Sequence, residues 1–541
     1  MKQLIECVPN FSEGRDLAII KQITNAIEAV DGVKLLDVDP GAATNRTVVT
    51  FVGEPQAVIN GALAGISKAH ELIDMSKHTG EHPRFGACDV CPLIPIANIS
   101  MDETVEWAHK LGKRIGEELQ LSGYYYENAA SKPERQNLSV VRAGEYEGLP
   151  KKLADDNWQP DFGPTTFNAK YGVTAVSARD FLIAYNINLN TTSTRRANAI
   201  AFDVREAGRS KREGNPITAT KAIGWYIEEY GVAQISMNLT NITITSVHEA
   251  FEAVCESAIS RGIRVTGSEL VGLVPKQAMI DAGKHFLTKQ ERSLGIDDEE
   301  IIKIAVKSLG LDELSPFDPK KKIIEYLLEG DADNKLVAKD LVAFANETAS
   351  ESPAPGGGSI SAYVGALGAS LATMVANLSA HKRGWDERWE EFSVWAEKGQ
   401  KIKDDLLYLV DEDTAAFNKI LTAIRLPKSS DAEKTARKEA IEAATKYAIE
   451  TPFRVMQRSF DCFEVCEAMA KTGLQASLSD AGVGALCARA AVIGAYLNVQ
   501  INCGDLTDEA FKQKVLADGA ALVEKANLKE AEILKLVQSK L

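Results

Sequence analysis

One sixteen-residue stretch, 77–92, brings together side-chain types that do acid–base or metal chemistry. It holds two His, two acidic residues, an Arg and two Cys, whereas the whole chain has only seven His. An apolar segment, 92–96, follows directly and is expected to form a buried strand. A polar loop beside a buried strand is a common place for reacting groups, because the sheet fixes the ends of the loop. This stretch is therefore the first candidate site.

The first interpretation of this stretch is a metal site. His78, His82 and the pair Cys88 and Cys91 have the residue types of a tetrahedral Cys₂His₂ zinc centre. Pro83 disfavours a helix that would present both His side chains on one face. The Cys pair also adjoins the apolar segment, where its members would project to opposite edges of an irregular strand. A single Cys-x-x-Cys is not specific for zinc, so zinc is the rival hypothesis.

The second interpretation is general acid–base catalysis, and the third is a hydrogen-bonded His with a structural role only. Histidine exchanges protons near neutrality, because its reference pKa is about 6.5. Glu81 or Asp39 could orient the imidazole, and Arg84 could bind a substrate carboxylate. The loop alone does not choose between catalysis and structure.

Composition limits the class of protein. A length of 541 residues is enough for several domains, and 45% apolar with 25% charged residues is ordinary for a globular protein. The net charge of −15 argues against nucleic acid or an anionic membrane as a partner. We expect no secretory leader at the N-terminus and no transmembrane helix, which would need about 18 uncharged apolar residues in a run. Eight Cys without a framework spacing predict reduced thiols and a cytoplasmic location.

Strand and helix patterns alternate through the front half of the chain. The first block predicts strands at 4–8, 33–38, 47–52 and 124–127, and helices at 17–30, 55–75 and 103–119. The turn Asp-Pro-Gly at 39–41 is expected between two of these strands. The second block predicts strands at 181–189, 219–227, 233–239 and 264–269, and helices at 193–206 and 247–260. Both blocks approximate the order strand, helix, strand, strand, helix, strand, so we expect two related α/β layers with helices packed on sheets.

Strand patterns mostly stop after about residue 336, where Ala and Leu become dense and helical spacing runs to the C-terminus. The expected fold class is therefore α/β (α+β), with two subdomains of mixed sheets and packed helices in the N-terminal half, followed by an all-α helix bundle. The expected domain limits are 1–180 and 181–326 for the two subdomains, 327–335 for a linker and 336–541 for the helical domain.

Asp413 is a candidate catalytic acid because of its position in a predicted helix. Apolar residues at 406, 409, 410, 416, 417 and 420 recur at spacings of three and four around it, so Asp413 falls in the middle of an apolar stripe. Asp411 and Glu412 fall away from this stripe, towards solvent. Burial raises the pKa of a carboxyl group, and a raised pKa makes a proton donor near neutrality. The alternative is a structural Asp that bonds a neighbouring helix.

Four motifs of the front half resemble the glutamate formiminotransferase family. They are ECVPNFSEG (6–14), DVDPG (37–41), HTGEHPR (78–84) and PDFGP (160–164). The back half, from SPAPGGGS (352–359) to DEDTAAF (411–417), resembles the cyclodeaminase family. The order and length resemble the fused formimidoyltransferase-cyclodeaminase family of histidine breakdown, over essentially the whole chain.

The resemblance implies two successive folate reactions. The front half would transfer the formimino group from N-formimino-L-glutamate to tetrahydrofolate, which gives 5-formiminotetrahydrofolate and L-glutamate. The back half would cyclise this product to 5,10-methenyltetrahydrofolate and release ammonia. The resemblance also implies that tetrahydrofolate is a co-substrate with a polyglutamate tail, that no metal takes part, and that the chain forms a homo-oligomer, an octamer.

The resemblance further implies the site residues. The transferase catalyst falls on His82, and the cyclodeaminase acid falls on Asp413, with Asp411 as the alternative in the Asp-x-Asp pattern. The folate-binding stretch falls on Gly163, Pro164, Thr165, Thr166, Phe167, Asn168, Ala169, Lys170, Tyr171 and Gly172. Its amides, hydroxyls and aromatic rings suit a pterin, which has hydrogen-bonding edges and flat faces.

Formimino transfer is attack by folate N5 on an amidine carbon through a tetrahedral intermediate. The incoming amine loses a proton and the glutamate nitrogen gains one, and one His can do both in turn, which suits His82. Asp39 would hold the imidazole, or else it only shapes the turn. Arg84 would bind a substrate carboxylate or pair with Glu81. The rival functions are a zinc-dependent deaminase or hydrolase and a non-catalytic folate-binding scaffold.

We predict that His82→Ala abolishes formimino transfer and leaves cyclodeamination working, because the imidazole serves only the first reaction. The measurement is the turnover of each reaction with its own substrate. Near-normal transferase turnover in this variant would remove His82 from its role.

Overall fold

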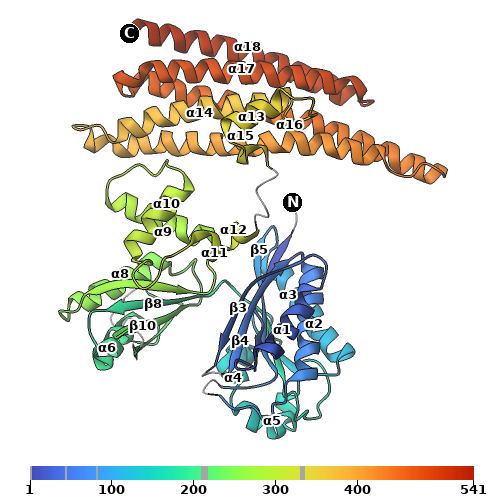
Figure 1. Ribbon diagram of the computed structural model, residues 1–541, viewed down its shortest axis with the longest axis vertical. Helices are drawn as coiled ribbons and strands as arrows, with labels where there is room; N and C mark the ends of the chain where they lie inside the picture. The colour runs from blue at the N-terminus through green and yellow to red at the C-terminus, as the bar shows by residue number, and fades with distance from the viewer. Residues whose placement is uncertain (1–2, 43–44, 81–82, 209–216, 229, 329–334) are drawn as a thin grey trace. The chain divides into compact units, whose positions relative to one another are not determined.

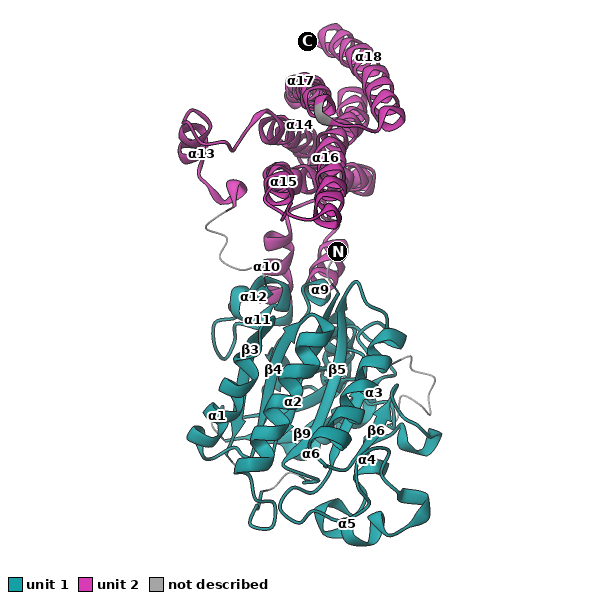
Figure 2. Ribbon diagram, turned by 90° about the vertical axis from the view of Figure 1, so that its right-hand side faces the viewer, with its two compact units in different colours: residues 1–279, 309–328 teal, residues 280–308, 329–541 magenta. Residues whose placement is uncertain are grey.

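The computed structural model describes residues 3–42, 45–80, 83–208, 217–228, 230–328 and 335–541 (Figure 1). The chain forms two compact units, which Figure 2 shows in different colours. Unit 1 consists of residues 1–279 and 309–328, and unit 2 consists of residues 280–308 and 329–541. Residues 280–308, which were expected in the second subdomain, belong to unit 2. The expected domain limits stay a prediction.

A mixed sheet organises the first part of unit 1, and within the described residues it has seven strands. The strand order is β1-β4-β2-β5-β7-β6, with β3 paired to β4. Strands β5 and β6 each pair with β7 in parallel, and the other pairs are antiparallel. The strands are β1 (Leu4–Cys7), β2 (Asn10–Phe11), β3 (Val33–Gly41), β4 (Arg46–Gly53), β5 (Cys88–Ala97), β6 (Gly123–Glu127) and β7 (Thr174–Ala178).

The alternation of side chains along these strands gives the sheet two different faces. Ile5, Phe51 and Leu93 point to one face and are buried in the core. This face is covered by α1 (Leu17–Glu28), α2 (Pro55–Leu72) and α3 (Met101–Glu118), which lie side by side in Figure 2. The alternate positions, such as Glu6 and Thr50, point to the opposite face, which borders a cleft. The cleft therefore takes its lining from every second residue of the strands.

Helices α1 and α3 begin where the sequence supplies a capping residue. The Asp16 carboxylate accepts from the Ala18 amide at 2.8 Å, and Ile20, Ile23 and Ile27 then recur on the buried face. In α3, Ser100 and Glu103 form a reciprocal capping box. These capping residues determine where α1 and α3 begin, and both helices pack on the apolar face of the sheet.

A second, antiparallel sheet follows in unit 1, with four strands among the described residues in the order β11-β8-β10-β9. Its strands are β8 (Ile183–Leu189), β9 (Thr220–Ile227), β10 (Val232–Leu239) and β11 (Val265–Val271). The helices α6 (Thr194–Val204) and α8 (Val247–Ile259) pack on it. Among the described residues, the other α-helices that lie wholly in unit 1 are α4 (Leu138–Val141), α5 (Glu145–Leu153), α11 (Pro319–Lys322) and α12 (Ile324–Leu328).

Unit 2 is a bundle of long helices packed through small residues. A Cβ added at Gly365 of α14 would lie 2.5 Å from the Ser459 hydroxyl of α16, and one at Gly368 would lie 2.8 Å from the Gly484 carbonyl of α17. The bundle helices are α14 (Gly357–Ala380), α15 (Trp389–Ile424), α16 (Asp431–Thr472), α17 (Leu478–Asn502) and α18 (Glu509–Lys540), and the shorter α13 (Leu341–Thr348) precedes them. The chain also forms α9 (Lys276–Lys289) and α10 (Asp298–Leu309).

Two helical segments of this bundle, Gly357–Ala380 and Gln475–Asn502, are long and apolar enough to span a membrane by length and composition alone. The expectation that the chain has no such run was therefore wrong. In the first segment, 61% of the apolar window is buried inside the bundle, as in a core helix of a globular domain. The absence of a membrane partner stays a prediction.

The expected fold class is confirmed, with mixed sheets and packed helices followed by a helical region. Residues 39–41 and the strand β7 (Thr174–Ala178) are among the details that differ from the expectation. Residues 39–41, expected as a turn, are the end of β3, because Asp39 still pairs with Val48 of β4. The strand β7 was missed, because its sequence Thr-Ala-Val-Ser-Ala is short and its members are all buried, which hides the alternation of a half-exposed strand.

We predict that Gly163→Ala destabilises unit 1. Gly163 has φ +77°, and an added Cβ would lie 2.0 Å from the Leu121 carbonyl oxygen. The left-handed conformation alone costs a non-glycine residue about 1–2 kcal/mol, and the clash adds to it. The measurement is the thermal unfolding midpoint, with Gly148→Ala in helix α5 as the matched control, because nothing lies within 4 Å of its Cβ position. Equal midpoints for the two variants would contradict this account.

Candidate functional sites

Unit 1 has two adjoining cavities, of about 650 Å³ and 330 Å³. Asn10, Arg179, Leu182 and Asn238 line both, so the two cavities form one cleft. One wall is the open face of the large sheet, and the other comes from residues of the second sheet and its connections. A cleft of this size between two packed layers is a usual place for a small-molecule site. We call the larger part the basic cavity and the smaller part the acidic cavity.

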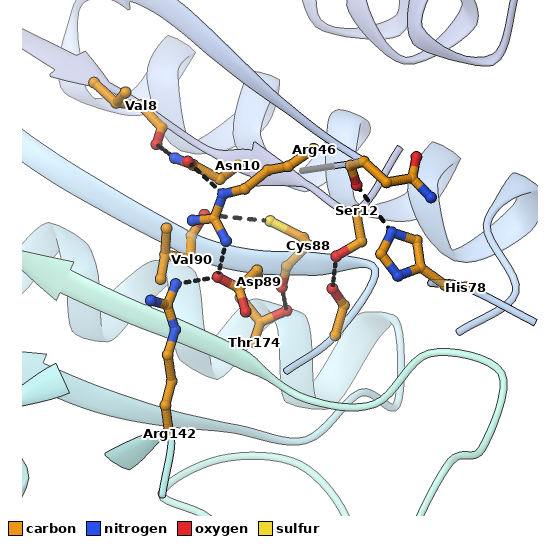
Figure 3. A network of polar contacts seen from close by, with 12 residues as sticks. Val8, Asn10, Ser12, Arg46, His78, Cys88, Asp89, Val90, Arg142 and Thr174 are labelled. Carbon is orange, nitrogen blue, oxygen red and sulfur yellow. Dashed lines mark hydrogen bonds and ion pairs between the residues drawn. The ribbon is translucent and has the colours of Figure 1, made fainter. Parts of the chain in front are cut away.

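The basic cavity is built on a buried ion cluster (Figure 3). Asp89, whose side chain is 0% exposed, accepts from Arg46 Nη1 at 2.5 Å and from Arg142 Nη2 through the same carboxylate oxygen. Arg46 also donates from Nε to Asn10 Oδ1 at 2.9 Å. Both arginines line the cavity. Two guanidinium groups on one carboxylate leave a net positive charge in this wall.

The acidic cavity is lined by three carboxyl groups, Glu6, Asp37 and Asp39, with Arg179 as its cation. Glu6 is only 2% exposed, and burial raises its pKa to about 7. Burial, reinforced by the nearby Asp39, also raises the pKa of Asp37. Asp39 is therefore placed in a cleft, at an exposed position near the end of β3.

The loop expected to carry the transferase catalyst is described only in part, because Glu81 and His82 lie outside the described residues. His78 Nε2 lies 2.9 Å from the Asn45 carbonyl oxygen, and burial lowers the His78 pKa. Asn45 also donates from Nδ2 to the Thr79 carbonyl at 2.9 Å. Arg46, the next residue along the chain, lines the basic cavity. The base of the loop is thus fixed next to a residue of the cleft.

Arg84 has structural partners on the other side of this loop. It donates to the His78 carbonyl, pairs with Glu147, and lies over the Tyr146 ring at 5.3 Å from the ring centroid. Arg84 was expected either to bind a substrate carboxylate or to pair with Glu81. The observed acidic partner is Glu147, and Glu81 is not among the described residues.

The expected folate-binding stretch, 163–172, lies beside this loop. The Met75 amide donates to the Lys170 carbonyl at 2.9 Å, and Tyr146, under Arg84, donates from its hydroxyl to the Ala169 carbonyl at 2.5 Å. Tyr171 is fully buried, so it offers no surface for stacking, whereas Phe167 packs against Tyr146 and is only half-buried. Among the described residues, none of 163–172 lines either cavity of the cleft.

Of the four residues considered as zinc ligands, the structure describes His78, Cys88 and Cys91, and each of these has a different partner. Cys91 Sγ lies 3.5 Å from Cys7 Sγ, and Cys88 Sγ donates to the Val90 carbonyl at 3.6 Å. All three Cys are buried in the core of the large sheet, as small apolar residues are. His78 bonds the Asn45 carbonyl instead. Over the described ranges, no group of three or more His, Cys, Asp or Glu is placed to hold a metal ion.

In unit 2, Asp413 lines a cavity of about 140 Å³ together with glycines 356–358, Phe417 and Asn498. Its Oδ2 accepts from the Ser359 amide at 3.1 Å, at the N-terminus of α14. A Cβ at Gly358 would lie 2.1 Å from Asp413 Oδ1, so only glycine lets the carboxylate approach this closely. Burial raises the Asp413 pKa, although the bonds from Ser359 oppose the shift. Asp413, which the apolar stripe singled out in the sequence, thus lines a cavity and has a raised pKa.

The two acids next to Asp413 have structural partners. Asp411 Oδ1 accepts from the Leu336 amide at 2.6 Å. Glu412 accepts from the hydroxyls of Tyr408 and Tyr447 and pairs with Lys419, and its side chain is only 13% exposed. The expectation that Glu412 points to solvent was wrong, because Tyr447 of α16 covers that face of α15.

Sequence reasoning missed the charged lining of the cleft: Glu6, Asp37, Arg46, Arg142 and Arg179. A signal was present in β1, where Glu6 interrupts apolar neighbours at a position that alternation assigns to the face away from the helices. No local pattern could show that Arg46, Asp89 and Arg142 meet, because they are far apart in the sequence.

Comparison with known proteins assigns these features to families. Residues 4–179 match the model of the formiminotransferase domain, N-terminal subdomain, and residues 184–329 match that of the formiminotransferase domain. Residues 340–520 match the model named formiminotransferase-cyclodeaminase. Together the three matches cover most of the chain.

Individual relatives match the whole chain or one half of it. A formimidoyltransferase-cyclodeaminase of Gallus gallus is 44% identical over 541 residues, which is 100% of both chains. A glutamate formimidoyltransferase of Thermoplasma acidophilum is 44% identical over 286 residues, 52% of this chain and 92% of its own. A methenyltetrahydrofolate cyclohydrolase of Methylorubrum extorquens is 34% identical over 197 residues, 36% of this chain and 95% of its own.

We predict that the parent protein loses stability as the pH becomes alkaline and that the Glu6→Gln variant does not show this loss. The folded-state pKa of Glu6 is about 7, against an ordinary value of 4.5. The stabilising contribution of the neutral acid is complete below the unfolded value and is lost as the pH rises through about 7. Each pKa unit corresponds to about 1.4 kcal/mol, so about 3 kcal/mol is lost by pH 8.

The measurement is the thermal unfolding midpoint at pH 5 and at pH 8. The Glu6→Gln variant should match the parent at the lower pH and exceed it at the higher pH. Glu106→Gln, at an exposed position of α3, is the matched control. Parallel pH dependences of the parent and Glu6→Gln would contradict the effect of burial.

Proposed function

The chain belongs to the formimidoyltransferase-cyclodeaminase family, and we propose that its two halves carry out the two reactions of that family in succession. It is an enzyme of folate one-carbon metabolism, as the motifs predicted. The front half transfers the formimino group of N-formimino-L-glutamate to tetrahydrofolate. The back half converts 5-formiminotetrahydrofolate to 5,10-methenyltetrahydrofolate and ammonia. The observation that carries this division is that each half has its own cavity, with several charged groups in the cleft of unit 1 and the carboxyl of Asp413 in the cavity of unit 2.

Unit 1 has the groups that the first reaction needs. The donor has two carboxylates and one amidine, so its site needs both cations and acids, and the cleft supplies both. Attack by folate N5 on the amidine carbon gives a tetrahedral intermediate, and collapse of this intermediate releases L-glutamate. The proton that leaves N5 and the proton that reaches the glutamate nitrogen pass through His82. The base of its loop is held by Asn45, next to Arg46 of the cleft wall.

Unit 2 has the group that the second reaction needs. Attack by folate N10 on the formimino carbon closes the ring, and the amino group then leaves as ammonia once its nitrogen is protonated. Asp413 donates this proton, because burial raises its pKa and so favours the neutral, proton-donating form. Its carboxyl is fixed by the Ser359 amide and faces a cavity that also contains the Phe417 ring.

Five further features belong to the same proposal. The folate carries a polyglutamate tail, which retains the intermediate near both sites. No metal takes part in either reaction. The chain works as a homo-oligomer, an octamer, in the cytoplasm, where its eight Cys stay reduced. The folate stretch 163–172 binds the pterin beside the loop of His82, a placement supported by the contacts of Tyr146 and Met75 with that stretch.

The experiment that tests the function is direct mixing of N-formimino-L-glutamate and tetrahydrofolate with the full chain. The proposal predicts the absorbance of 5,10-methenyltetrahydrofolate together with one ammonia and one L-glutamate for each folate. A cyclohydrolase activity of the back half, the activity named for the Methylorubrum relative, would instead consume added methenyltetrahydrofolate without ammonia. A protein that binds folate but releases no L-glutamate would be a scaffold.

We predict that Asp413→Asn lowers cyclodeaminase turnover by about 10²- to 10⁴-fold, the usual contribution of a general acid, and leaves transfer intact. 5-Formiminotetrahydrofolate should accumulate. In the parent, cyclodeaminase turnover should fall as the pH rises through the raised pKa of Asp413, since the proton donor is the neutral form.

Asp411→Asn is the matched control, because an Asn at this position still accepts from the Leu336 amide. It should keep both activities. If instead Asp411→Asn stops ammonia release and Asp413→Asn does not, the acid has been assigned to the wrong residue.

A further inference from the structure

The two cavities of the unit 1 cleft carry opposite charge. The basic cavity has four cations in its lining, Arg46, Arg142, Arg179 and Lys221, against the acids Glu127 and Asp180. Among the described residues that line it, the acidic cavity has three carboxyl groups and one cation, Arg179. A ligand that spans both cavities therefore meets a positive region at one end and a negative region at the other.

Arg46 and Arg142 present two fixed guanidinium groups in the lining of the basic cavity. The two side chains are only 11% and 16% exposed, and both are held by the fully buried Asp89. The Nε of Arg142 is buried without a hydrogen-bond partner among the described residues. A guanidinium that is fixed and desolvated binds a carboxylate more tightly than a surface lysine does, because it loses little conformational freedom on binding.

The proposed donor of the formimino group has the matching charge distribution. Its glutamate part has two carboxylates, and its formamidine is a strong base that is protonated near neutrality. In the reverse orientation the carboxylates would face Glu6, Asp37 and Asp39, and those of the three acids that are ionised would repel them. The charges of the cleft therefore select one of the two orientations.

We propose that N-formimino-L-glutamate lies along the cleft with its carboxylates on Arg46 and Arg142 and its formamidinium group towards Glu6, Asp37 and Asp39. This inference rests on the proposed function of unit 1. It assigns carboxylate recognition to Arg46 and Arg142 rather than to Arg84, whose guanidinium pairs with Glu147. It also places the reacting carbon at the end of the cleft where Asp39 lies.

The test is Arg142→Gln in the full chain, assayed for transfer at varied donor and varied tetrahydrofolate. Loss of a charge-assisted carboxylate contact should raise the KM for the donor about 10- to 100-fold and leave the KM for tetrahydrofolate unchanged. Arg114→Gln is the matched control, because Arg114 is a partly buried arginine of α3 that also pairs with a carboxylate, Glu118, outside the cleft. It should keep both constants.

Two further measurements separate recognition from folding. Arg142→Lys retains the charge without the planar guanidinium, so its KM for the donor should lie between those of the parent and Arg142→Gln. Calorimetric titration with L-glutamate, the product, should give a Kd about 10- to 100-fold weaker in Arg142→Gln than in Arg114→Gln.

A change of substrate tests the orientation directly. The parent should strongly prefer N-formimino-L-glutamate to N-formiminoglycine, which lacks the second carboxylate, and Arg142→Gln should lose most of this preference. Equal donor KM values and equal L-glutamate Kd values in Arg142→Gln and Arg114→Gln would overturn the proposed orientation. If the parent itself makes no L-glutamate from the donor and tetrahydrofolate, the proposed function of unit 1 fails instead.

Discussion

The sharing of the Asp89 carboxylate by Arg46 and Arg142 is the interaction on which the cleft of unit 1 depends. A buried carboxylate without partners is destabilising, so the two arginines stabilise the sheet here. Asp89 comes from β5, Arg46 from β4, and Arg142 follows α4, so one cluster fixes three parts of the chain. The same contact leaves positive charge where the cleft opens. Structural stability and anion recognition thus come from the same three side chains.

Alternation along the strands explains why such a cluster can exist beside a large apolar core. One side of the sheet is occupied by Ile5, Phe51, Leu93 and their neighbours, which pack on helices. The other side carries polar residues such as Glu6, Asp37 and Thr50 among apolar ones, and these line the cleft. In unit 2 a glycine makes room for the ionisable group, since Gly358 allows the Asp413 carboxylate to reach the N-terminus of α14. In both units an ionisable group is held against a rigid element rather than on a long loop.

Much of the architecture follows from local sequence signals, and much of the site does not. The helices and strands of the second sheet were predicted within a few residues, because their apolar periodicity is strong. Asp413 was identified from the sequence, because the helical spacing of its apolar neighbours indicates which face of the helix is buried. Arg142 was not found, because ion pairs between residues far apart in the sequence leave no periodic trace. The partners of Glu412 were missed for the same reason, since Tyr447 belongs to another helix.

The central claim is that the Asp89-bound arginines hold the glutamate part of the donor. A crystal structure of the full chain with L-glutamate bound tests it most directly. The account predicts a glutamate carboxylate within hydrogen-bonding distance of the guanidinium groups of Arg46 and Arg142, with the amino group towards Asp39. L-Glutamate bound only at Arg84, or with its amino group towards Asp89, would contradict it.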